Sequence, residues 1–275
     1  MKKLSKFKKL LLKGDHKSYL VLFFLFGVLV VLIAALIIYN RAKTPIYGFI
    51  EGISVESFGM LLDILVLGVI FHYFKGKGEK ERRIERYKEE IDDFRGWSEP
   101  EAKFRIVGNI KRLLRLGAKN LDLNNCFLKG TNLDKANLSS VNLHKANLSE
   151  SELIGVDMTD AFLLFTDLLY AKMTCAKLNK AELSRADLSN AKLVEADLSS
   201  ANLFCTKLTN VNLAGAKLFK ANLSGANLSG ANLSGANGLT LEQLLQAKTL
   251  YKANGLPLEI EKELREKKPQ LFIKP

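Results

Sequence analysis

Few side chains in this sequence have the type and spacing that catalysis requires. The chain has three histidines, His16, His72 and His144, and none lies beside a cysteine or carboxylate at the spacing of a metal site. The glycine-rich motifs that cradle phosphates and the G-x-S-x-G motif of a nucleophilic serine are also absent. We therefore expect a protein that is not an enzyme, with no catalytic, cofactor-binding or metal-binding residue.

Two carboxylates, Glu56 and Asp63, interrupt an otherwise apolar stretch over residues 53–74. Their spacing places both on one face of a helix, together with Gly59. Ionisable groups inside a bilayer suggest proton or cation sensing, or hydrogen bonding across an oligomer. The simpler alternative, which we favour, puts Glu56 at the membrane interface and leaves Asp63 protonated and hydrogen-bonded to the helix predicted over residues 19–39.

A cluster of outward apolar side chains is the other candidate site. Such side chains would bind a partner and would not catalyse a reaction. It lies in the stretch FLLFTDLLYA, where Leu163 and Leu168 point inward by the register described below. A patch of this kind on a regular surface indicates an interaction site. The alternative is that it packs against a helical neck or a membrane hairpin of the same chain, both of which are predicted below. The candidate residues are Phe162, Leu164, Phe165, Leu169 and Tyr170, with Phe204 two coils later on the same face as Leu164.

These positions are set by a five-residue repeat. A leucine or methionine recurs at every fifth residue from Leu123 to Leu233, and a small residue, most often alanine, stands two positions before it. This period would place leucine on every side of an α-helix, so an amphipathic helix is excluded. Two inward positions in every five instead indicate a solenoid in which four short segments make one square coil. Almost six coils, stacked at the strand spacing, would form a column about 28 Å tall.

The stretch KANLSGANLSGANLSGANG resembles the pentapeptide-repeat family. The resemblance covers Asp122–Gly238 and implies an all-β solenoid, a right-handed quadrilateral β-helix, over residues 119–238. The pattern departs at Phe127 and Phe162, where the family usually has a polar residue. It also departs at Gly238, which takes a leucine position and predicts that the β-helix ends there.

Two apolar segments precede the repeat. Residues 19–39 contain no charged side chain and are long enough to cross a bilayer as a helix, and residues 53–74 are a second candidate. A signal peptide is the alternative for the first, but its apolar run is too long and lacks a clean cleavage site. Residues 1–18 carry seven lysines and one aspartate, and residues 75–118 carry thirteen basic and nine acidic residues. Basic flanks at both outer ends predict a two-helix transmembrane hairpin with both termini cytoplasmic.

Helical elements are expected on both sides of the β-helix. A neck over residues 78–96 has an apolar seam compatible with a short coiled coil. A capping box formed by Ser98 and Glu101 would open a capping helix over residues 98–117, which covers the first coil. A basic face of that helix against the membrane surface is the secondary reading. The seam consists of Ile84, Tyr87, Ile91 and Phe94, and the covering face of Phe104, Val107, Ile110 and Leu114.

The C-terminal segment, residues 239–275, is expected to form the second cap. Its apolar spacing predicts a helix from Leu241 to about Lys252, a break at Asn254-Gly255, and a second helix from Pro257. The family resemblance also leaves open that this end mediates dimerisation.

The cysteines and the charge balance limit the compartment and the partners. Cys126, Cys175 and Cys205 form no disulfide framework, which is typical of the cytoplasm. Residues 119–238 carry twelve basic and eleven acidic residues, so the acidic surface of the family's DNA mimics, which act on topoisomerases, is missing. The basic excess lies beside the predicted membrane, where anionic lipid explains it, and we expect no nucleic-acid partner.

We therefore expect a membrane-anchored scaffold that presents its β-helix to an unidentified protein partner. The expected location is the plasma membrane, or another energy-transducing internal membrane, with the β-helix in the cytoplasm and the bilayer itself as a partner. A homo-oligomer formed through the neck and spans would add avidity. A sensor whose hairpin responds to a lipid or an ion is the alternative function.

Overall fold

The computed structural model describes Gly27 and residues 47–274. The predicted tail of residues 1–18 lies outside the described residues, and so does the predicted helix over residues 19–39 apart from Gly27. The chain divides into two compact units after Arg82, and the second unit contains the entire solenoid.

The first described element is α3, a single helix from Tyr47 to Asp93. The neck predicted over residues 78–96 is helical as far as Asp93, and it is continuous with the preceding segment, because α3 runs through Gly76 and Gly78. Lysine, arginine and glutamate, which favour helix, surround these glycines and outweigh their cost of about 1 kcal/mol each. The span predicted over residues 53–74 falls inside α3. Over the residues that the structure describes, no helix is both long and apolar enough to cross a membrane.

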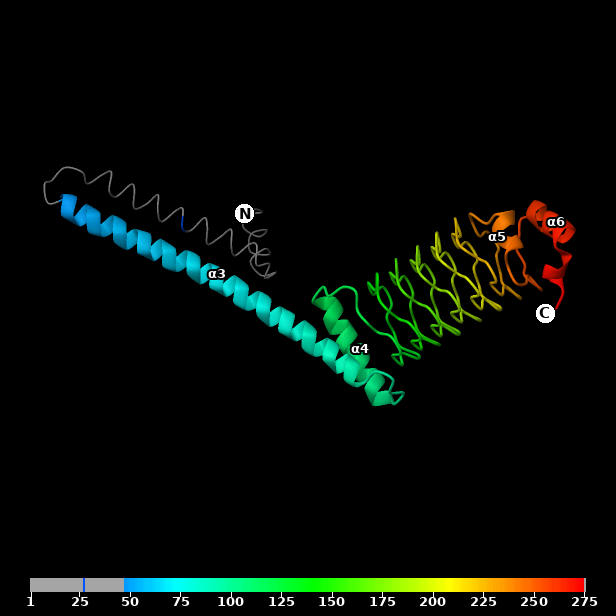
Figure 1. Ribbon diagram of the computed structural model, residues 1–275, viewed down its shortest axis with the longest axis horizontal. Coiled ribbons are helices and arrows are strands. Elements are labelled where there is room, and N and C mark those ends of the chain that lie inside the picture. Colours follow the sequence, from blue (N-terminus) through cyan, green and yellow to red (C-terminus); the bar gives the residue numbers. More distant parts are fainter. Residues whose placement is uncertain (1–26, 28–46, 275) are drawn as a thin grey trace, which may run out of the picture. The chain divides into compact units, whose positions relative to one another are not determined.

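The repeat folds into the predicted β-helix solenoid. Each five-residue repeat, here called a phrase, starts at the small residue and has the leucine third. Its second residue forms a parallel bridge with the residue twenty positions later, from Asp122 with Asn142 to Lys217 with Asn237. Backbone hydrogen bonds join the same coils, such as Leu183 N–H to the Asn202 carbonyl at 2.8 Å. Four phrases therefore close one coil, and the coils stack from α4 towards α5 (Figure 1).

The corner of each phrase explains why the period is five. The amide of the next small residue, such as Ala186, donates to the carbonyl of the central leucine, here Leu183, at 3.0 Å. This turn requires a positive φ at the fifth residue of the phrase, which Arg185 adopts at 58° and Gly225 at 69°. The small residue lets the turn close, and the leucine fills the axis. Every central residue from Leu123 to Leu233 is at most 2 % exposed.

Asparagine and aspartate are frequent at the second position because they make two kinds of hydrogen bond there. Asp187 Oδ1 accepts from the Ser189 backbone amide at 3.0 Å and so caps the corner. Asn222 donates to Asn202 Oδ1 at 2.9 Å and so links neighbouring coils. These side chains thus form hydrogen-bonded ladders along the outside of the column.

The first coil is covered by α4, Pro100–Arg115, and by the last turns of α3. The predicted capping box is wrong: Glu99 is the N-cap, no side chain caps the helix, and Pro100 starts it instead. Of the predicted covering face, Phe104 is wrong because it is 80 % exposed, whereas Ile110 is buried and Val107 and Leu114 pack against the core. The buried residues of α4 are Ala102, Ile106, Asn109, Ile110 and Leu113.

The apolar seam of the predicted neck is used within the chain. Ile91 is 2 % exposed, and Ile84, Tyr87 and Phe94 pack against the same core, so the seam is occupied by this chain's own cap. Arg95 then fastens the end of α3 to the first coil by donating to the Asn124 carbonyl at 2.6 Å.

The C-terminal cap differs from the prediction in its first half. Helix α5 spans only Leu241–Leu245, after which Thr249 and Asn254 bridge to Asn227 and Asn232. The β-helix therefore resumes beyond Gly238 for part of a coil, and the helix expected from Leu241 to about Lys252 starts as predicted but ends at Leu245. Helix α6, Leu258–Lys267, and the 3₁₀-helix η1, Pro269–Phe272, close this end, where Leu250 donates to the Leu271 carbonyl at 2.7 Å.

Truncation of one central leucine tests the stacking. Leu183 is fully buried, so we expect Leu183→Ala to lower the free energy of unfolding by about 2–5 kcal/mol. Ser199→Ala is the control, because Ser199 faces outward in a nearby repeat of the same β-helix and should change stability by about 0.5 kcal/mol or less. Urea unfolding followed by circular dichroism measures both, and equal effects would contradict the inward register.

Acidification tests the outward ladder. Partial burial acts to raise the pKa of Asp187, but hydrogen bonds from Ser189 and the Lys207 ammonium outweigh it, so this pKa lies below its ordinary value. The pKa of Asp157 is lowered in the same way, by Thr159 and Lys177 against partial burial. A lowered pKa in the folded state gives stability that is present above the unfolded value of about 3.9 and is lost below it. We expect the urea midpoint to fall between about pH 5 and pH 3, and to fall less in Asp187→Asn. An unchanged midpoint would contradict this account.

Candidate protein-interaction surface

The candidate cluster surrounds two neighbouring corners of the β-helix. Corner 1 comprises residues 144–145, 164–165, 184–185 and 204–205, and corner 2 comprises residues 149–150, 169–170 and 189–190. Each pair is the fourth and fifth residue of a phrase, and successive pairs are one coil apart. Phe162 lies on the flat side that leads into corner 1.

The aromatic members of the cluster are exposed. Phe162 is 56 % exposed, Tyr170 55 %, Phe165 42 % and Phe204 38 %. Leu164 and Leu169 are half-buried. Neither α4 nor the part of α3 from Arg83 onward covers the four rings. Within the described part of the second unit, the cluster is therefore a free surface.

Phe165 is positioned by contacts with the coils on either side. Its ring meets the His144 ring edge to face at 5.9 Å, and the Arg185 guanidinium lies over it at 5.5 Å. The sequence period predicts the contact with Arg185, which lies twenty residues later, whereas the ring on the other side belongs to His144 and not to Lys145, the residue twenty positions earlier. Phe165 also has a φ of 58°, as Tyr170 does, and bulky side chains rarely adopt this conformation.

Phe162 interrupts the outward hydrogen bonds of its side. Asn142 is bonded to Asp122 at 2.9 Å and Asn202 to Glu182 at 2.9 Å, but the phenyl group between these pairs can join neither. It also offers no oxygen to the Leu164 amide, unlike Asn142, which accepts from the His144 amide at 3.2 Å. Phe162 therefore gives up hydrogen bonds that the repeat normally makes, while its own ring remains exposed.

The other predicted sites do not assemble into a reactive centre. Asp63 is exposed on α3, and the side chain of Glu56 is outside the described part. Among the described residues, no group of three histidine, cysteine or acidic side chains could hold a metal ion. Burial raises the pKa of the Cys126 thiol to about 11, so this inward cysteine stays protonated.

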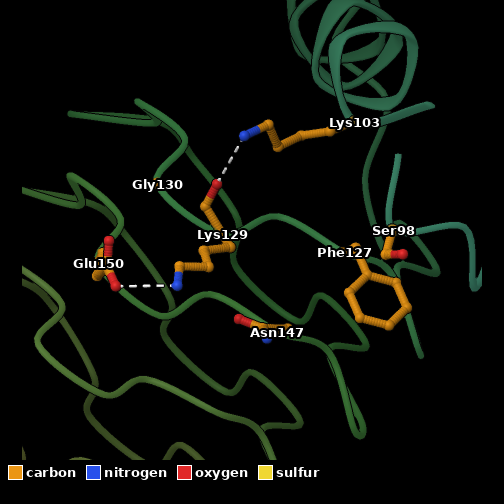
Figure 2. Close-up of a pocket in the computed structure, with 7 residues that line it drawn as sticks. All are labelled: Ser98, Lys103, Phe127, Lys129, Gly130, Asn147 and Glu150. Carbon is orange, nitrogen blue, oxygen red and sulfur yellow. Dashed lines mark hydrogen bonds and ion pairs between the residues drawn. The ribbon is translucent and has the colours of Figure 1, made fainter. Parts of the chain in front are cut away.

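A groove beside the first coils was not foreseen from the sequence. It has a volume of about 430 Å³ and lies between the start of α4 and the first two coils (Figure 2). Lys129 pairs with Glu150 at 3.0 Å, and Lys103 donates to the Lys129 carbonyl at 3.1 Å, so its cations are already engaged. The sequence feature that could have indicated this groove is Phe127, an aromatic residue at a position that is usually polar in the repeat. The lining residues are Ser98, Lys103, Phe127, Lys129, Gly130, Asn147 and Glu150.

A family model described as pentapeptide repeats matches the solenoid in eight copies, over residues 119–149, 146–185, 181–218 and 206–237. The chain belongs to the pentapeptide-repeat family. No curated protein matches this pentapeptide-repeat protein.

Solved structures of family members resemble it. HetL from the cyanobacterium Nostoc sp. strain PCC 7120, involved in heterocyst differentiation regulation, is 31 % identical, with 49 % of this chain and 72 % of HetL covered at a TM-score of 0.21. Rfr23 from the cyanobacterium Cyanothece 51142 is 28 % identical, with 46 % and 93 % covered at a TM-score of 0.27. QnrB1, a plasmid-mediated fluoroquinolone resistance protein, is 19 % identical, with 57 % and 84 % covered at a TM-score of 0.45.

The strained aromatic corner of this pentapeptide-repeat protein can be tested for a role in folding. Tyr170 is exposed at a φ of 58°, so Tyr170→Gly should raise the free energy of unfolding by about 0.5–1 kcal/mol. The same change at Lys192, an exposed bridge residue, should lower it by about 0.5–1 kcal/mol. Chemical unfolding of the two variants measures the difference. A destabilised Tyr170→Gly protein would show that the tyrosine supports the fold.

Proposed function

We propose that this protein is a non-catalytic scaffold whose β-helix binds another protein through the aromatic cluster at corners 1 and 2. One observation carries the proposal. In two consecutive phrases, Phe162 replaces a polar residue of the outward ladder, and Phe165 and Tyr170 are bulky residues with positive φ, yet all three rings remain exposed. Residues that do not suit the local backbone or hydrogen-bonding pattern are typical of functional sites. Exposed aromatic side chains are also those most enriched where protein partners bind.

The scaffold is proposed to be tethered at the cytoplasmic face of a membrane. The sequence over residues 19–39, which has no charged side chain between basic flanks, supports this tether. The apolar side chains of α3 between Met60 and Phe74 support it further, because many of them are exposed and need cover. Such a tether would hold the β-helix near a membrane-associated partner.

Site-specific photocrosslinking in cells tests the scaffold. A photoreactive amino acid at Phe165 should capture a distinct protein, whereas one at Lys180 should not. Lys180 is a matched control because it is exposed and occupies the same left-handed corner position, with a φ of 59°. The captured band should weaken in Phe162→Ser. Equal capture from both positions, or no capture from Phe165, would contradict the proposal.

The tether is tested separately by fractionation. The full chain should remain with the membranes after alkaline carbonate washing, and a chain lacking residues 1–74, which removes both apolar segments, should be released. Release of the full chain would refute the tether without affecting the scaffold.

A further inference from the structure

Corner 1 carries two cations without acidic partners. Among the described ion pairs of the β-helix, Lys129 pairs with Glu150 and Lys207 with Asp187, but neither Lys145 nor Arg185 pairs with a carboxylate. The nearby carboxylate of Glu182 is occupied by the Asn202 amide at 2.9 Å. Both cations are exposed, and Arg185 is held over the Phe165 ring. Positive charge is therefore displayed here and not neutralised by the fold.

The order of side chains along corner 1 alternates between basic and apolar. Lys145, Phe165 and Arg185 occupy the same position in three successive coils, and Phe204 follows in the next coil. Coils are spaced by about 4.8 Å, so the two cations are about 10 Å apart along the column. A complementary partner needs acidic and apolar side chains that alternate at this spacing.

An α-helix lying along the column meets this spacing and an extended strand does not. Successive turns of a helix are about 5.4 Å apart, whereas same-side residues of a strand repeat at about 6.8 Å. A partner strand could bind by strand addition only at an unpaired sheet edge. Corner 1 offers no such edge, because each coil there is bridged to the coil on either side. A nucleic acid is disfavoured because two cations can neutralise only about two phosphates, which supplies little of the electrostatic free energy that such binding depends on.

We propose that corner 1 binds an acidic amphipathic helix of the partner, with acidic and apolar residues alternating turn by turn along one face. The acidic residues meet Lys145 and Arg185, and the apolar residues meet Phe165 and Phe204. This inference rests on the proposed scaffold function and assigns it a partner class.

The test uses the full-length protein in detergent micelles and a synthetic fluorescent peptide of about 20 residues with glutamate and leucine alternating at successive turns of one face. Fluorescence anisotropy should show saturable binding. Arg185→Glu and Lys145→Glu should each weaken it by roughly tenfold, because reversal replaces attraction by repulsion. Lys180→Glu makes the same charge change at a different corner and should leave the affinity unchanged.

A charge-reversed peptide, with lysine in place of glutamate, is the control that distinguishes loss of the binding site from misfolding of the variants. It should bind the Lys145→Glu, Arg185→Glu double variant better than it binds the original protein. Absence of this reversal, equal loss in Lys180→Glu, or competition by heparin as effective as that by unlabelled peptide would overturn the proposal. Capture of a protein from Phe165 with no peptide binding would overturn this partner class and leave the scaffold function standing.

Discussion

The structure depends on a corner that the chain must turn every five residues. At each corner a left-handed residue completes a turn closed by the next small residue, as Arg185 does between Leu183 and Ala186. Four such corners return the chain to its starting face, so the bridges join residues twenty apart and the leucines stack along one axis. The same geometry leaves the second, fourth and fifth positions outside. Only these positions are free to carry function, and they are where the sequence departs from its own repeat.

The sequence predicted the solenoid well because the repeat encodes its inward contacts locally. The leucine period from Leu123 to Leu233 matches the buried axis without a slip. The caps were predicted less well because their boundaries depend on contacts between distant segments. Ser98 and Glu101 match a capping box, yet Pro100 starts the helix without one. The spacing after Leu241 suits a helix as far as Lys252, but pairing of Thr249 with the last coil outweighs it.

The sequence predicted which residues of the candidate surface face outward, but not their backbone conformation or their contacts. The register alone shows that Phe162, Phe165 and Tyr170 face outward. It does not show that two of them occupy left-handed corners, because many corners in this chain hold residues other than glycine. It also does not show that Arg185 is held over Phe165 with no acidic partner. The contacts of Phe165 with His144 and Arg185 leave its ring 42 % exposed, and the rings of Phe162 and Tyr170 are more exposed still. The proposed binding role rests on this exposure.

The central claim is that the aromatic cluster is kept for a partner at the expense of the fold, and the free energy of unfolding of Phe162→Asn tests it most directly. Asparagine would restore the ladder between Asn142 and Glu182 and an acceptor for the Leu164 amide. We predict that this variant is more stable than the original protein by about 0.5–1.5 kcal/mol, whereas Asn202→Phe, the reverse change two coils away, is less stable. A less stable Phe162→Asn protein would contradict the claim, because the phenylalanine would then be supporting the fold.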